Sequence, residues 1–231
     1  MADLFLYGTL RYVPLLECVL GRSAESLDAR QAQLADHAVR QVRDQPFPAI
    51  EACEGASAPG LLLRGVTQQD LDALNFYEGG FDYALKQVEV RLEGGEPAHA
   101  ELYFPAPGMW DTTELWDLDG WIADWGALSL RAAEEVMDLR GCKSAEEIAR
   151  IFPSIRRRAA SWLAAQARPE DPAHDLARDV RVHGHKRAYV NFFAMEELDL
   201  QFRRYDGRFS PVVNRGVALV GRGAVVLPCD P

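Results

Sequence analysis

The chain lacks the features that mark secreted, membrane-spanning and zinc-binding proteins. Its 231 residues include four cysteines, and no two of them have the C-x-x-C spacing of a zinc site. No apolar run approaches the roughly 20 residues that a membrane span needs, and the N-terminus lacks the basic start and the apolar stretch of a signal peptide. We therefore expect a cytoplasmic protein with reduced cysteines.

Basic residues are also few compared with acidic ones. The 25 lysines and arginines against 35 aspartates and glutamates give a formal net charge of −10. Such a charge repels nucleic acids and anionic membranes, so we expect neither as a partner. The one basic cluster, Arg156-Arg157-Arg158, follows a helical pattern and is predicted to be a solvated face.

The first half of the chain has the patterns of a mixed α+β domain. They predict strands at 3–8, 81–92 and 98–105, helices at 13–20 and 67–80, and shorter strands between 37 and 66. A glycine closes the first helix. Thr67 and Asp70 form the N-terminal cap of the second, and Gly79 and Gly80 end it.

A helical pattern follows the first domain. It predicts helix over 113–167, with one buried stripe that contains Trp116, Trp121 and Trp125. Ser144 and Glu147 have the spacing of a capping box inside this region.

The chain therefore divides into three parts, each with its own pattern. Residues 1–110 are the mixed α+β domain, and residues 111–170 are a helical connector. Residues 171–231 alternate again and predict a C-terminal antiparallel β segment.

Four segments of the first domain, in order along the chain, carry a family resemblance. They are Tyr7-Gly8-Thr9-Leu10, "PFPAI" at 46–50, "PGLLLRGV" at 59–66 and "LDALNFYEGGFDYALKQVEV" at 71–90. The ordered set resembles the γ-glutamylcyclotransferase-like family, including its AIG2-like branch, over residues 3–105. The resemblance implies a mixed β-barrel or sheet with flanking helices. It also implies an enzyme that converts a small-molecule γ-glutamyl amine or peptide to 5-oxoproline plus a free amine, without a metal or organic cofactor.

The resemblance gives each part of the site a role. Glu78 matches the family's catalytic glutamate, and one carboxyl group can act as both base and acid if burial raises its pKa toward neutrality. The loop after the first strand presents backbone N–H groups to the substrate carboxylate, and glycine allows a close approach. The residues that we expect to bind substrate are Tyr7, Gly8, Thr9, Leu10 and Tyr83.

Each of these residues also has a purely structural interpretation. Gly8 can be only a tight turn between a strand and a helix, and Glu78 can be a surface residue at a helix end. Tyr83 and Tyr103 fit core positions with their hydroxyls at a rim. The sequence leaves both sets of interpretations open.

Residues 187–231 resemble a second family. The pattern from "RYDG" to "GAVVLPCD" is similar to the first part of Nudix hydrolases of the ADP-ribose pyrophosphatase type, whose N-terminal sheet contributes to a homodimer. The resemblance implies a homodimer, and a Mg²⁺ ion only if a downstream Nudix box were present. We expect the Nudix part to be incomplete and without hydrolase activity. The arrangement resembles proteobacterial cyclotransferase–Nudix fusion proteins associated with tellurite resistance.

Asn75 departs from the family pattern, which usually has an aspartate three residues before the catalytic glutamate. That aspartate is taken to support the reaction. The change therefore favours an alternative function, in which the domain binds a small acid without turnover or serves as a dimerisation module for a Nudix half.

Overall fold

The computed structural model describes residues 2–78, 83–167 and 175–220 of the chain. The chain forms two compact units, Met1–Ala149 and Arg150–Pro231. The three-part division expected from the sequence stays a prediction. No helix in the described ranges is long and apolar enough to cross a membrane.

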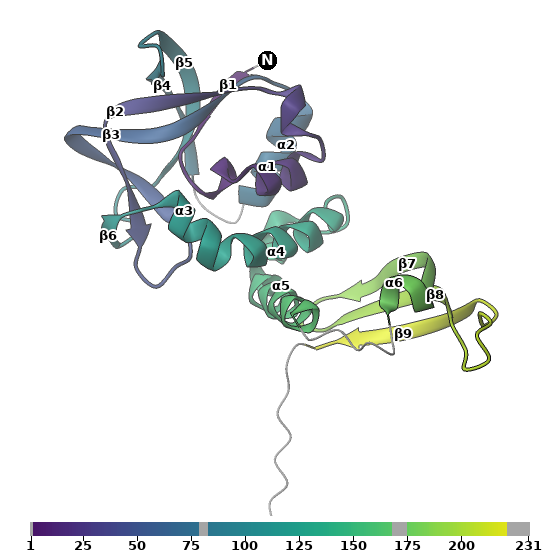
Figure 1. The fold of residues 1–231 in the computed structure, drawn as a ribbon. Helices are drawn as coiled ribbons and strands as arrows, with labels where there is room; N and C mark the ends of the chain where they lie inside the picture. Colours follow the sequence, from purple (N-terminus) through teal and green to yellow (C-terminus); the bar gives the residue numbers. More distant parts are fainter. Residues whose placement is uncertain (1, 79–82, 168–174, 221–231) are drawn as a thin grey trace, which may run out of the picture. The chain divides into compact units, whose positions relative to one another are not determined.

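Five strands of the first unit close into a β-barrel, and a sixth lies at its edge (Figure 1). They are β1 (Ala2–Leu6), β2 (Asp28–Val42), β3 (Pro48–Val66), β4 (Tyr83–Leu92), β5 (Pro97–Pro105) and β6 (Thr112–Leu115). The order is β3-β1-β5-β4-β2, and pairing of β2 with β3 closes the ring, while β6 pairs with β2. β1 and β5 run parallel, and the other pairs are antiparallel. This architecture confirms the predicted mixed α+β fold.

The long hairpin of β2 and β3 makes the closure possible. The two strands have 15 and 19 residues and pair along nearly their whole length, with one irregularity between Ala35 and His37. There Asp36 has a φ of 55°, and its carboxylate accepts a hydrogen bond from the Gly55 N–H at 2.9 Å. Such a bulge bends and twists a strand, which favours barrel closure.

Two helices of the first unit keep the caps that the sequence predicts. They are α1 (Val13–Leu20) and α2 (Gln68–Glu78). Gly21 ends α1 in the left-handed conformation, with a φ of 67°. Thr67 caps α2, because its Oγ1 accepts from the Asp70 N–H at 3.2 Å and its own N–H donates to the Asp70 carboxylate at 2.9 Å. The predicted stop at residues 79–80 lies outside the described residues.

The apolar run of β1 is buried on both of its faces. Leu4 and Leu6 belong to a core cluster that includes side chains of α1 and α2. Phe5 and Tyr7 point the other way and belong to a second cluster, which includes side chains of β2, β4 and β5. A strand covered on both faces has a continuous apolar sequence rather than an alternating one, and "LFLY" has this pattern.

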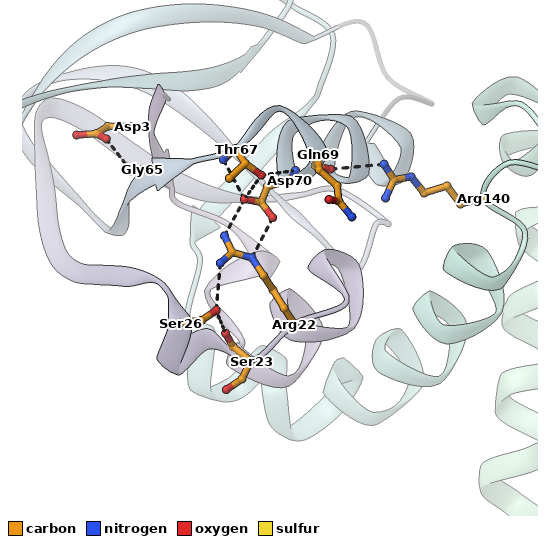
Figure 2. A network of polar contacts seen from close by, with 9 residues as sticks. All are labelled: Asp3, Arg22, Ser23, Ser26, Gly65, Thr67, Gln69, Asp70 and Arg140. Carbon is orange, nitrogen blue, oxygen red and sulfur yellow. Dashed lines mark hydrogen bonds and ion pairs between the residues drawn. The ribbon is translucent and has the colours of Figure 1, made fainter.

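A partly buried ion pair connects the end of α1 to the start of α2 (Figure 2). The Arg22 guanidinium donates to both carboxylate oxygens of Asp70, at 3.0 and 2.7 Å, and the Asp70 side chain is 4% exposed. Burial alone would raise the pKa of Asp70, but the hydrogen bonds from Arg22 and Thr67 hold it below its usual value of 3.8. Arg140 adds a contact to the same region by donating to the Gln69 carbonyl.

We expect Arg22→Ala to lower the free energy of unfolding by about 2–3 kcal/mol at neutral pH, because it leaves the Asp70 carboxylate buried without its guanidinium. The difference from the wild type should shrink as pH falls below 3.8, because Asp70 takes up a proton first in the unfolded chain and, at lower pH, in the folded wild type. Urea unfolding at several pH values measures both effects. Arg30→Ala is the matched control, since Arg30 and its partner Asp28 are 50% and 47% exposed; a similar loss in the control would contradict the prediction.

Gly60 in β3 is a position where backbone and ring approach each other closely. A Cβ atom there would lie 2.2 Å from Cζ of Phe5 and 2.6 Å from the carbonyl oxygen of Leu6. The inward ring of Phe5 therefore occupies the space that any larger residue would need.

Gly60→Ala should lower the free energy of unfolding by about 2–3 kcal/mol, since the added methyl group forces the Phe5 ring or the β1 backbone to move. Gly94→Ala provides the control, because a Cβ at Gly94 meets no atom within 4 Å. Thermal unfolding of both variants is the measurement. Equal stability of the two would show that the barrel interior adapts without cost.

The prediction of a helical region over 113–167 is wrong in its first part. Residues 112–115 form β6, and the helical region begins only after Asp117, whose carboxylate accepts from the Gly120 N–H. The helices are α3 (Leu118–Trp121), the π-helical turn η3 (Ile122–Gly126), α4 (Ala127–Asp138) and α5 (Ala145–Gln166). Trp121 is 5% exposed but Trp125 is 37% exposed. The predicted stripe fails because Trp116 precedes the first helix and Trp125 lies inside the π turn, so the three tryptophans do not share one regular helical face.

The second unit contains an antiparallel sheet, as the sequence predicts. Its elements are α6 (Leu176–Asp179), β7 (Val180–Val190), β8 (Ala194–Phe202) and β9 (Val213–Leu219), with strand order β7-β8-β9. Arg158 on α5 is 6% exposed and donates to the carbonyls of Asn191 and Phe192 in the β7–β8 turn. The predicted solvated basic face is therefore wrong for Arg158.

Candidate active site

Glu78 is the last residue of α2 and lies half-buried at the end of that helix. Burial raises the pKa of its carboxyl group from 4.5 to about 7. Near neutral pH, both the protonated and the ionised forms of Glu78 are therefore populated. A group in this state can take up a proton and give it back within one reaction.

Three tyrosines from separate strands of the barrel surround this carboxyl group. Tyr7 directly follows β1 and is 8% exposed, Tyr83 begins β4, and Tyr103 lies in β5. Burial is the largest cause of the raised pKa of each phenol, and the charge of Glu78 adds to all three. The pKa values of Tyr83 and Tyr103 rise to about 12, so these groups stay neutral when Glu78 ionises.

Tyr103 also binds the helix that carries Glu78. Its hydroxyl donates to Oδ1 of Asn75 at 2.5 Å, and Asn75 is exposed. The sequence suggested a core position for Tyr103 and no contact with Asn75. The two residues are 28 positions apart, one on α2 and one on β5, so no local pattern could have indicated the bond.

The loop that follows β1 continues directly from Tyr7 to Gly8 and a short helical turn. Residues Thr9–Arg11 form a 3₁₀ turn, η1, in which the Arg11 N–H donates to the Gly8 carbonyl at 3.1 Å. The hydrogen bonds within the turn begin with the Arg11 N–H, so the N–H groups of Gly8, Thr9 and Leu10 precede them. The Leu10 side chain is 4% exposed in the core, which leaves only its backbone for binding.

Gly8 does not need the conformational freedom of glycine at this turn. Its φ is −105°, outside the left-handed region, and an added Cβ would lie at an ordinary contact distance of 3.5 Å from Cγ of Pro48. Pro48 belongs to the "PFPAI" segment. The structure therefore places two of the four sequence motifs, the Tyr7 to Leu10 loop and "PFPAI", close together.

Metal ligands do not cluster in the part of the chain that the structure describes. No group of three or more histidine, cysteine, aspartate or glutamate side chains there could hold a metal ion. The chemistry that these residues offer is proton transfer by one carboxyl group, with neutral hydroxyls and backbone N–H groups around it.

This fold and arrangement of motifs have a counterpart among known families. Residues 4–122 match the sequence model of the family described as "Gamma-glutamyl cyclotransferase, AIG2-like", over slightly more than half of the chain. The chain belongs to this family. Its AIG2-like domain thus includes β1 to β6, α1, α2 and α3. The roles of Glu78, Tyr83 and the Tyr7 to Leu10 loop stay predictions.

Several solved structures are similar to the chain. A solution structure from Arabidopsis thaliana is 23% identical, with 61% of this chain and 81% of that chain covered and a TM-score of 0.43. A structure named "Gamma-glutamyl cyclotransferase" is 15% identical, with 58% and 85% covered and a TM-score of 0.39. An AIG2-like protein from Mus musculus is 19% identical, with 51% and 88% covered and a TM-score of 0.35. No curated protein matches significantly.

The family match ends at residue 122 and does not extend to the second unit. The resemblance of residues 187–231 to Nudix hydrolases stays a prediction. The same holds for the fusion arrangement and for its association with tellurite resistance.

We expect Glu78→Gln to make the domain more stable than the wild type at neutral pH. The raised pKa means that folded Glu78 keeps its proton between pH 4.5 and about 7, whereas the unfolded chain releases it. The wild type therefore loses stability as pH rises through this window, and the variant should gain about 2 kcal/mol relative to it at pH 7.

Denaturant unfolding of both proteins from pH 4 to 8 measures this difference. Asp72→Asn on the exposed side of α2 is the matched control, because it makes the same chemical change at an exposed position. If the free energy of unfolding depended on pH in the same way for wild type and Glu78→Gln across this window, the raised pKa of Glu78 would be contradicted.

Proposed function

We propose that the AIG2-like domain converts a γ-glutamyl amine or γ-glutamyl peptide to 5-oxoproline and a free amine, with Glu78 as the general acid and base. The observation that carries the proposal is the burial of Glu78 among three tyrosines, which raises its pKa to about 7. Membership of the family supports the reaction class.

The proposed reaction is a ring closure within the substrate. Ionised Glu78 takes a proton from the substrate α-ammonium, and the resulting amine attacks the γ-carbonyl carbon to form the new C–N bond of the five-membered ring. Glu78 then gives this proton to the departing nitrogen as the bond from that carbon breaks. A second proton passes from the ring nitrogen through Glu78 to the departing amine, which leaves as an ammonium ion, and Glu78 is ionised again. Because the reacting groups belong to one molecule, the substrate itself supplies much of the proximity.

The substrate α-carboxylate needs a fixed binding site, because its position decides where the amine points. The N–H groups of Gly8, Thr9 and Leu10 are the proposed donors, since they precede the hydrogen bonds of η1. Tyr7 and Tyr83 are the proposed walls of the site, and their hydroxyls stay neutral because burial raises their pKa. No metal or organic cofactor takes part in these steps.

Glu78→Gln should lower kcat for 5-oxoproline release by about 10²–10⁴, which is the usual contribution of a positioned acid or base. The assay uses a panel of γ-glutamyl amines and γ-glutamyl peptides, with 5-oxoproline quantified by mass spectrometry. Asp72→Asn is the control on the same helix and should keep wild-type rates. Equal rates for wild type and Glu78→Gln would overturn the proposal.

A second candidate is binding of a small acid without turnover, which Asn75 favours as a departure from the family's usual aspartate. Calorimetry with 5-oxoproline and with glutamate separates the two. Tight binding with no product from any substrate in the panel would support the second candidate. Localisation in the cytoplasm and a homodimer stay predictions.

A further inference from the structure

We propose that Asn75 and Tyr103 form a positioning pair for this reaction: Asn75 holds the Tyr103 hydroxyl beside Glu78 without adding a charge to the site. The inference rests on the proposed function and assigns a role in it to two further residues. Tyr103 is the member that contacts the substrate amine, and Asn75 acts through Tyr103.

The geometry of α2 and β5 brings the pair to the site. Residues three apart on a helix share a face, so Asn75 lies one turn before Glu78 on the same side of α2. Tyr103 is opposite Leu85 in the β4–β5 ladder and reaches from the barrel to the helix. Its bond to Asn75 Oδ1 therefore joins β5 directly to the last turn of α2.

The bond also decides what the Tyr103 hydroxyl can offer to a ligand. A phenol has one proton to donate, and Tyr103 gives it to Asn75. Its oxygen then faces its other neighbours as an acceptor. A substrate ammonium group has only donors, so an amine held beside Glu78 finds in Tyr103 the acceptor that its remaining N–H groups need.

Asn75 performs this role without a charge. Among the described residues, the charge of Glu78 raises the pKa of four tyrosines. They are Tyr7 after β1, Tyr77 on α2, Tyr83 on β4 and Tyr103 on β5. Burial raises the pKa of each, so all four are neutral phenols near pH 7. A carboxylate at position 75 would be a negative charge one helical turn from Glu78, and it would raise the pKa of Glu78 further.

Asn75→Asp tests this idea because it keeps the acceptor for Tyr103 and the size of the side chain, while it replaces the amide NH₂ by a charged oxygen. The rising limb of the pH profile of kcat/KM, which follows ionisation of Glu78, should move to higher pH by about 0.5–1 unit. The shift should shrink as salt is added, since screening weakens the repulsion between the two carboxylates. The size of the shift measures how strongly a charge at position 75 acts on Glu78, and the variants of the hydrogen bond below test the positioning role.

Gln69→Glu is the matched control for charge. It adds one negative charge at an exposed position on the same helix, nine residues before Glu78 and about 13 Å along the axis. At that distance salt screens most of the interaction, so its pH profile should match that of the wild type.

Two further variants test the bond itself. Tyr103→Phe should lower kcat/KM about 10-fold or more, because the substrate ammonium loses an acceptor. Asn75→Ala leaves the hydroxyl without its fixed partner and should have a smaller effect in the same direction. In the double variant the loss should equal that of Tyr103→Phe alone, since Asn75 acts only through Tyr103.

A measurement that needs no turnover separates this inference from the proposed function. Glu78 can be titrated by NMR of carboxyl-labelled glutamate, with its signal assigned through Glu78→Gln. If the wild type releases no 5-oxoproline but Asn75→Asp raises the Glu78 midpoint, the proposed function fails and the effect of Asn75 on Glu78 stands. The inference is overturned if the Glu78 midpoint moves by less than about 0.2 pH units in Asn75→Asp. It is also overturned if the losses of kcat/KM in Asn75→Ala and Tyr103→Phe multiply in the double variant.

Discussion

The pairing of β2 with β3 is the constraint on which the candidate site depends. Because β3 also pairs with β1, closing the ring fixes β1 between β3 and β5 with both faces buried. The alternation of β1 then sends Leu4 and Leu6 toward the helices and sends Phe5 and Tyr7 toward the other core cluster. Tyr7 can reach the carboxyl group only from this position. An open sheet would leave the direction of the strand end, and of the loop after it, undetermined.

The helix that carries Glu78 is held at its first turn and in its middle, and this explains how the fold tolerates a carboxyl group with a raised pKa at its end. The ion pair of Arg22 with Asp70 fixes the first turn of α2, and Leu74 is fully buried in the middle. Raising a carboxyl pKa by burial is a cost to the folded state near neutral pH. Apolar packing of the rest of the helix and the barrel offsets that cost, so the unfavourable group stays in place.

Local signals predicted the elements, but contacts between distant segments decide the site. The end of α1 at Gly21 and the cap at Thr67 depend on a few neighbouring residues, and both could be predicted. The start of the helical region after Asp117 could not, because pairing of β6 with β2 competes with helix formation there. The bond from Tyr103 to Asn75 has no signal within either segment, because it joins β5 to α2 across 28 positions of the chain.

The surroundings of Glu78 determine how many titrating groups the proposed chemistry can use. Strongly coupled carboxyl groups lose their protons in two steps that belong to the pair, and neither midpoint then belongs to one group alone. Among the described residues, burial is the cause of the raised pKa of Glu78, and its neighbours are phenols whose own pKa values are high. Glu78 can therefore titrate as one group near pH 7. A neutral asparagine one turn away is consistent with this requirement, since it supplies a hydrogen-bond acceptor and no second proton.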